Sequence, residues 1–133
     1  MVDHKILALD FDGVISNPYH LKLKYINDFG YNIQLNECTF GLCVKTNKVD
    51  PLHYKIANEK ALSAEPDKIK LVDGFLKYYD LLQRFPVKTF IVTSRNDHQM
   101  NSLIDIIDSY NLKFYDIINT NGRNKIEALT LIS

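Results

Sequence analysis

The sequence predicts an α/β fold in which helices alternate with the strands of a parallel, Rossmann-like sheet. Three apolar runs, at residues 5–9, 87–92 and 113–118, are typical of strands. Helically spaced apolar residues precede the second run and separate it from the third. Strands that alternate with helices favour a parallel sheet with right-handed crossovers. A length of 133 residues suits one domain of ordinary size.

The composition is that of a globular protein, with 46% hydrophobic and 24% charged residues. The 16 basic residues balance the 16 acidic ones, so the net charge gives no argument for nucleic acid or an anionic membrane as a partner. No apolar run approaches the roughly 18 residues of a transmembrane helix. Residues 1–5 lead directly into a strand and leave no room for a signal peptide. With only two cysteines, Cys38 and Cys43, we expect small buried residues and a cytoplasmic protein.

The first half of the chain begins with a strand at 5–9, which an unbroken apolar run predicts to be buried on both faces. A turn follows at 13–16. The apolar spacing predicts a helix over 19–29, with Gly30 as its C-cap. Residues 31–50 carry no clear pattern beyond a short helix beginning near Asn36.

A second helix is expected over 51–63, because proline after an aspartate suits the first helical position. Its apolar residues would point inward; they are Leu52, Ile56 and Leu62. The second half of the chain has a sharper pattern. Its expected elements are a helix from Asp73 or Gly74 to Arg84, the strand 87–92, a helix to about Tyr110 capped by Asp97, the strand 113–118, and a last helix over 125–131.

Polar residues follow each strand of the predicted sheet. Asp10 and Asp12 come after the first strand, Thr93, Ser94 and Arg95 follow the second, and a polar loop of residues 119–125 follows the third. Ligands of open α/β sheets bind at the carboxyl ends of the strands. We therefore expect these three groups to meet at one edge of the sheet.

The two aspartates of the first strand stand two residues apart, so an extended chain would point both carboxylates into one crevice. Two acids held together can divide the work, one as nucleophile or metal ligand and the other as proton carrier. Gly13 allows the sharp turn that follows. A hydroxyl and the lysine Lys125 beside them indicate phosphoryl transfer to an acid, in which a lysine and Mg²⁺ neutralise the phosphoryl charge.

These motifs resemble those of the haloacid dehalogenase superfamily of phosphatases and phosphotransferases. The first motif is similar to residues 10–15, the second to residues 90–95, and the third to the lysine that opens the late helix at 124–129. Residues 72–75 also resemble the entry into the helix before the second strand. An acid at Asp12 is the mark of the phosphatase branch.

The resemblance implies a site residue by residue. Asp10 would be the nucleophile and an Mg²⁺ ligand, and Asp12 would be the acid/base and lend its backbone carbonyl to the metal. Thr93, Ser94 and Lys125 would hold the phosphoryl oxygens. It also implies a core domain of residues 1–16 and 71–133, and a helical cap insert of residues 17–70 that chooses a small phosphorylated metabolite as substrate.

The chain departs from this family in its fourth motif, an acidic pair on a further strand that completes the Mg²⁺ site. Residues 126–133 hold one acid, Glu127, inside the expected last helix. Without the fourth strand, residues 6–9 would form an exposed apolar edge. We expect a truncated product, a homo-oligomer or partner chain over this edge, or a rebuilt sheet, and an Mg²⁺ site short of oxygen ligands.

Two other functions remain open from the sequence. A non-catalytic descendant of the family would bind a partner through the uncovered edge of 5–9. A receiver-like phospho-acceptor also uses acids, a hydroxyl and a lysine, but it needs its acceptor at the end of the third strand, whereas Asp116 lies within that strand. Arg95 is expected either to contact substrate or to lie on the surface.

Overall fold

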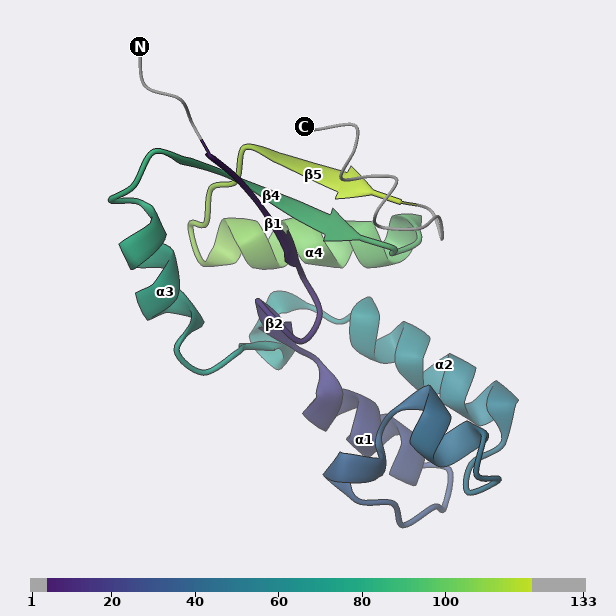
Figure 1. Ribbon diagram of the computed structural model, residues 1–133. Helices are drawn as coiled ribbons and strands as arrows, with labels where there is room; N and C mark the ends of the chain where they lie inside the picture. The colour runs from purple at the N-terminus through teal and green to yellow at the C-terminus, as the bar shows by residue number, and fades with distance from the viewer. Residues whose placement is uncertain (1–4, 121–133) are drawn as a thin grey trace.

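A parallel sheet forms the centre of the computed structural model, which describes residues 5–120 (Figure 1). Its strands are β1 (Lys5–Asp10), β4 (Val87–Thr93) and β5 (Asp116–Asn119), in the order β1-β4-β5. Both pairings are parallel. This arrangement confirms the α/β fold that the sequence predicts. The last expected helix, with Lys125, lies outside the described residues.

The register brings the carboxyl ends of the strands level with one another. Asp10 pairs with Val92 across β1 and β4, and Thr93 pairs with Asn119 across β4 and β5. Side chains that follow these positions therefore emerge at the same edge of the sheet.

Helix α4 (Asp97–Ser109) runs along one face of the sheet, and α3 (Phe75–Leu82) leads into β4 (Figure 1). The α4 side chains Leu103 and Ile106 are fully buried and share a core with Ile91 of β4. Apolar residues at helical spacing have thus formed the stripe that faces the sheet. The cap of α4 is Asn96, whose side chain accepts a hydrogen bond from the Gln99 N–H, so the expectation of Asp97 as cap was wrong by one residue.

Between β1 and β4 the chain forms a helical segment, residues 19–62, beside the sheet (Figure 1). Its helices are α1 (Tyr19–Asn27), the 3₁₀ turn η1 (Leu35–Glu37), the π-helical turn η2 (Phe40–Val44) and α2 (Pro51–Leu62). Helices α1 and α2 pack on each other around a second core that includes Ile26, Cys38, Cys43 and Ala57. Both cysteines are buried there, as expected.

The inward face of α2 differs from the expectation. Leu52 is 61% exposed, whereas the small residues Ala57 and Ala61 are buried. Alanines allow the backbones of two helices to approach closely, which the leucine and isoleucine pattern of α2 did not reveal. The following 3₁₀ turn η3 (Pro66–Lys68) returns the chain toward the sheet.

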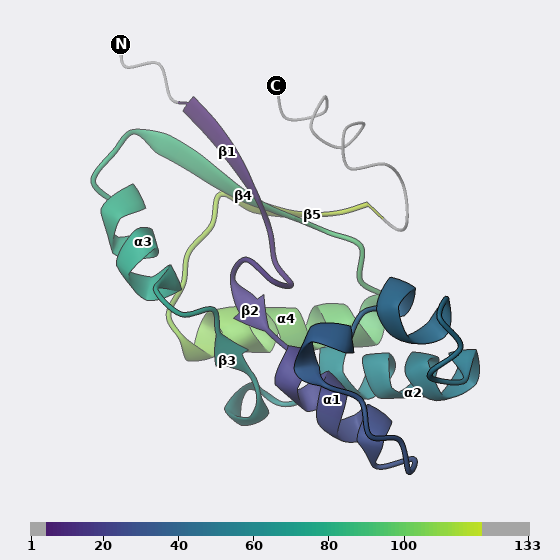
Figure 2. The same ribbon diagram turned by 60° about the horizontal axis from the view of Figure 1, so that its bottom comes forward.

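A small antiparallel ribbon pairs the chain just before the helical segment with the chain just after it. It pairs β2 (Ser16–Asn17) with β3 (Lys70–Leu71), and Val72 donates a further backbone hydrogen bond to Ile15 at 2.8 Å. Figure 2 shows this ribbon between the sheet and α1. Strands of two residues leave too little pattern to be predicted, so the sequence did not reveal the ribbon.

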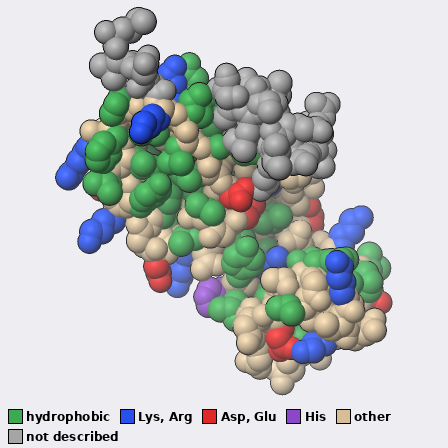
Figure 3. Space-filling view, viewed as in Figure 1, with side chains coloured by type: hydrophobic (Ala, Val, Ile, Leu, Met, Phe, Trp, Pro, Cys, Tyr) green, Lys and Arg blue, Asp and Glu red, His purple; other side chains and the backbone are tan. Residues whose placement is uncertain are grey.

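Strand β1 lies at the edge of the sheet within the described residues, and the exposure of its side chains corrects the prediction that it is buried on both faces. Ile6 is 45% exposed, and Leu7 to Leu9 are only partly covered. Figure 3, viewed as in Figure 1, shows hydrophobic side chains gathered over the side of the molecule on which β1 lies. The exposed edge that the sequence predicts at residues 6–9 is thus present in the part of the chain that the structure describes.

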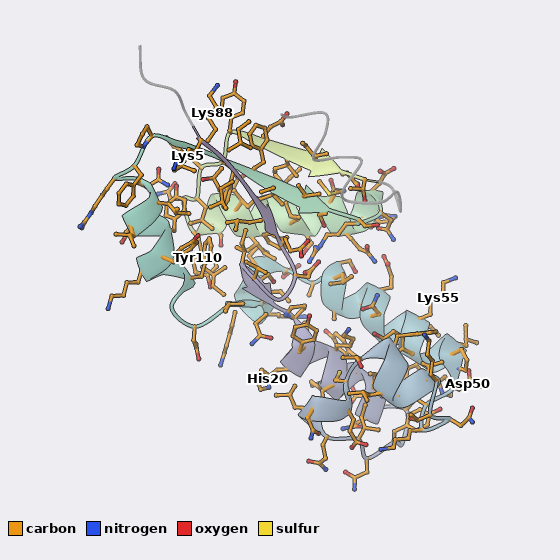
Figure 4. The ribbon with its side chains drawn as sticks, viewed as in Figure 1. Lys5, His20, Asp50, Lys55, Lys88 and Tyr110 are labelled. Atoms are coloured by element: carbon orange, nitrogen blue, oxygen red, sulfur yellow. The ribbon has the colours of Figure 1, made fainter. Side chains whose placement is uncertain are left out.

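Charged side chains lie at both extremities of the molecule. Lys5 and Lys88 stand at the amino ends of β1 and β4, while Asp50 and Lys55 lie on the helical segment far from the sheet (Figure 4). Neither group is near the carboxyl ends of the strands. Across residues 5–120, none of the helices combines the length and the apolar character needed to cross a membrane.

Candidate active site

A crevice of about 190 Å³ opens at the carboxyl ends of β1 and β4. Its lining residues are Asp10, Phe11, Asp12, Leu62, Val92, Thr93, Ser94 and Arg95. The structure therefore brings together the four predicted site residues that it describes, Asp10, Asp12, Thr93 and Ser94. The fifth, Lys125, lies outside the described residues. The helical segment also contributes to the wall, through Leu62 at the end of α2.

The turn after β1 explains how two acids come to face one crevice. Phe11 is 1% exposed and anchors the turn in the core, while its carbonyl accepts hydrogen bonds from the N–H groups of Ile15 and Ser16. Gly13 has a φ of +88°, which glycine adopts without a Cβ penalty. Strand β1 thus ends at Asp10, the chain bends at Phe11, and the turn of residues 13–15 follows directly after Asp12.

The end of β4 supplies the hydroxyl side of the crevice. Thr93 is buried, and its carbonyl accepts a hydrogen bond from the Thr120 N–H at 2.8 Å, which ties the end of β4 to the end of β5. Ser94 is exposed. Asn96 then caps α4, so only the short loop of residues 94–96 separates the last strand residue from the helix. A loop this short fixes where its side chains can lie.

Asp12 forms a two-point ion pair with Arg95. The Nε of Arg95 donates to Oδ2 of Asp12 at 3.0 Å, and its Nη2 donates to Oδ1 at 2.5 Å. Arg95 is 3% exposed, which excludes the surface position that the sequence left open as an alternative to substrate contact. The sequence indicated this residue only by its place after a strand. An ion pair between residues 83 positions apart cannot be recognised from local pattern.

The helical segment also meets the turn after β1, at Gly13. Tyr19, the first residue of α1, lies against Gly13 with its hydroxyl. Behind it, the buried ammonium of Lys22 lies 5.2 Å from the centroids of the Tyr19 and Tyr54 rings and donates to the Tyr54 hydroxyl at 3.1 Å. A lysine is stabilised in such a position by cation–π contacts.

The oxygen atoms that line the crevice decide whether it can bind a hard cation such as Mg²⁺. Asp10 offers a carboxylate and Asp12 a backbone carbonyl, which are the oxygen ligands that Mg²⁺ prefers. Both carboxylate oxygens of Asp12 already accept from Arg95. Within residues 5–120 no cluster of three or more histidine, cysteine or acidic side chains could hold a metal. The described residues therefore fit Mg²⁺ in kind but supply only part of a coordination shell.

A larger hollow of about 460 Å³ lies between the end of α2 and α4. It is lined by Glu59, Ser63, Ala64, Glu65, His98, Asn101, Ser102 and Asp105. Three of these are acids, which would repel a phosphoryl group. Volume alone does not make a site, and the smaller crevice has the chemistry that the sequence motifs predict.

Comparison with known proteins gives likenesses in structure only. Neither a protein-family model nor a curated protein sequence matches the chain. The crystal structure of a hydrolase from Streptococcus pneumoniae TIGR4 matches with a TM-score of 0.60 and 14% identity, over 98% of this chain and 76% of that one. That of a "putative phosphatase" from Clostridium difficile matches with a TM-score of 0.63 and 19% identity, over 99% and 70%. At such identities the likeness shows a shared fold: the chain has the α/β architecture of these two proteins.

Proposed function

We propose that the chain is a phosphatase-type hydrolase of the haloacid dehalogenase kind, which acts on a small phosphorylated metabolite through an aspartyl-phosphate. The observation that carries this proposal is the crevice in which Asp10, Asp12 and Thr93 converge from two parallel strands. The two structural neighbours, one a hydrolase and the other named for phosphatase activity, support the same class of reaction.

In the proposed reaction, the phosphoryl group is transferred in two steps, first to Asp10 and then to water. A carboxylate oxygen of Asp10 attacks phosphorus in line, the bond from phosphorus to the leaving oxygen breaks, and Asp12 gives its proton to that oxygen. Water then attacks the phosphorus of the aspartyl-phosphate and gives a proton to Asp12, and the bond between phosphorus and the Asp10 oxygen breaks. Inorganic phosphate leaves, and the Asp10 carboxylate is restored.

The remaining residues bind and orient the phosphoryl group. The Thr93 and Ser94 hydroxyls lie at the end of β4, where they can donate hydrogen bonds to phosphoryl oxygens. We assign the same role to Lys125. Asp10 and the Asp12 carbonyl would hold Mg²⁺, which when bound would neutralise phosphoryl charge. The helical segment, with Leu62 in the crevice wall, would act as the cap that selects the substrate, within the predicted insert of residues 17–70.

The proposal is tested with a generic aryl phosphate as substrate. Wild type should release phosphate with Mg²⁺ and lose activity with EDTA, and Asp10→Asn should abolish turnover. Asp108→Asn, which neutralises an exposed acid on α4, is the matched control and should keep full activity. Equal turnover by wild type and Asp10→Asn would overturn the proposal.

A second candidate function rests on the exposed edge strand. Ile6 is 45% exposed on β1, which has no strand beside its outer edge within residues 5–120. Such an edge pairs readily with another chain. A non-catalytic protein that binds a partner or a second copy through β1 would explain it. Sedimentation that shows a monomer, together with Mg²⁺-dependent phosphatase activity, would exclude this candidate.

A further inference from the structure

Arg95 is a charged residue that the protein has buried almost completely. It is 3% exposed, and its guanidinium lies 5.0 Å from the centroid of the Phe11 ring. Burying a charge is costly unless partners replace the lost water. The contacts of this side chain therefore show what the protein gains by placing it there.

One set of contacts fixes the Asp12 carboxylate. Nε and Nη2 each donate to a different oxygen of that group, at 3.0 and 2.5 Å. Two parallel hydrogen bonds fix the plane of a carboxylate, which a single bond would leave free to rotate. Each oxygen keeps a further lone pair, so Asp12 can still exchange a proton with a molecule in the crevice.

The other set of contacts reaches the helices. Nη1 donates to the carbonyl of Leu62, the last residue of α2, at 2.8 Å, and to the carbonyl of Gln99 in α4 at 2.7 Å. The backbone is held as well, because Nδ2 of Asn119 in β5 donates to the Arg95 carbonyl at 2.6 Å. One side chain thus connects the turn after β1, the end of the helical segment and the start of α4.

We propose that Arg95 is a positioning residue, which fixes the Asp12 carboxylate toward the crevice and ties it to the end of α2. The inference rests on the proposed function, because it concerns how the proton carrier of that reaction is held. It makes the helical segment a structural support of the reacting groups as well as a wall of the crevice. Lysine cannot replace the arginine, since an ammonium lacks the planar fork that grips two oxygens and two carbonyls.

A matched control distinguishes the positioning of Asp12 by Arg95 from a purely structural role of Arg95. Ser102 of α4 donates to the carbonyl of Ala64, just beyond α2, at 2.6 Å. Ser102→Ala therefore removes a buried link between the same two parts of the molecule without touching Asp12. The experiment compares Arg95→Gln, Arg95→Lys and Ser102→Ala, each alone and combined with Asp12→Asn. Single-turnover and steady-state rates on an aryl phosphate give kcat and KM.

We expect Arg95→Gln and Arg95→Lys to lower kcat at least about tenfold, with a smaller change in KM, because proton transfer by a well-placed group contributes at least that much. In the Asp12→Asn background the same substitutions should cause no further loss, because the group that Arg95 positions is already gone. Ser102→Ala should have the same effect in both backgrounds. If Arg95→Gln fails to fold, Arg95→Lys, which keeps the charge, completes the same comparison.

Losses that multiply when position 95 and position 12 are changed together would overturn the inference and leave the proposed function standing. An unchanged kcat in Arg95→Lys would overturn it too. A different result would overturn the proposed function, namely equal turnover by wild type and Asp10→Asn. That result would overturn the inference about Arg95 as well.

Discussion

The hydroxyl of Tyr19 lies directly against Gly13, where α1 meets the turn after β1. A Cβ at residue 13 would stand 2.9 Å from the Tyr19 hydroxyl oxygen, a distance that real Cβ atoms almost never show. The absence of a side chain at Gly13 therefore leaves the room that the Tyr19 hydroxyl occupies.

Gly13→Ala should therefore destabilise the protein for two separate reasons. The left-handed φ of +88° costs an alanine about 1–2 kcal/mol, and the contact with Tyr19 adds to this. Unfolding by urea measures the sum. Tyr19→Phe should recover the contact part only, because the next nearest atom of the ring would be 3.6 Å away. If the double variant is as unstable as Gly13→Ala alone, the contact is not tight.

Ile91→Ala should cost about 2–5 kcal/mol of unfolding free energy, because it opens a cavity in the centre of the core. Ile91 lies in β4, between β1 and β5, and is 0% exposed. The matched control is Ile104→Ala on α4, where the side chain is 43% exposed and the loss should be below about 1 kcal/mol. Similar losses for the two variants would contradict the observed core.

Substitutions of Thr93 test whether its hydroxyl, at the end of β4, binds the phosphoryl group. Thr93→Val keeps the shape of a buried side chain but removes the donor, so kcat on an aryl phosphate should fall about tenfold or more. Thr93→Ser restores the hydroxyl and should keep most of the activity. Urea unfolding of both variants checks that the core tolerates them. A fully active Thr93→Val would show that this hydroxyl does not bind the phosphoryl group.

Burial raises the pKa of the Cys38 and Cys43 thiols above the usual value, so the reactive thiolate is scarce in the folded protein. Iodoacetamide should label both slowly at pH 8 and rapidly in denaturant, as intact mass will show. The raised pKa also has a stability consequence. The contribution of the two protonated thiols to the free energy of unfolding is fully present below the thiol pKa of the unfolded chain. It is lost as the pH rises through the higher pKa of the folded protein. Rapid labelling of the folded protein would contradict the burial.

Glu37 shows the opposite pH dependence. A hydrogen bond from the Lys48 ammonium, with a second from the Gln34 N–H, lowers the pKa of its carboxyl. The resulting stability is present above the ordinary glutamate pKa and is lost as pH falls through the lowered value. Lys48→Met should remove most of this acid-dependent part in urea unfolding at pH 7 and pH 3. The effect should be small because the pair is partly exposed, and an unchanged pH dependence would contradict it.

Much of the site follows from local rules. An apolar run that ends in Asp10 and Asp12, and a second that ends in Thr93, predict strand ends, and parallel pairing predicts that strand ends meet. The structure brings these three residues into one crevice. The position of Lys125 in this arrangement stays a prediction, because it lies outside the described residues.

The sequence by itself determined the order along the chain of the central strands and their neighbouring helices, and the edge of the sheet at which the polar residues gather. Both follow from local patterns, namely the periodicity of apolar residues and the polar residues that come directly after each strand. Only the tertiary structure decided that Arg95 is buried against Asp12 and that the Tyr19 hydroxyl lies against Gly13. These features depend on which distant segments pack together. That choice is set by the total burial of apolar surface and the pairing of buried charges, which no local pattern of residues records.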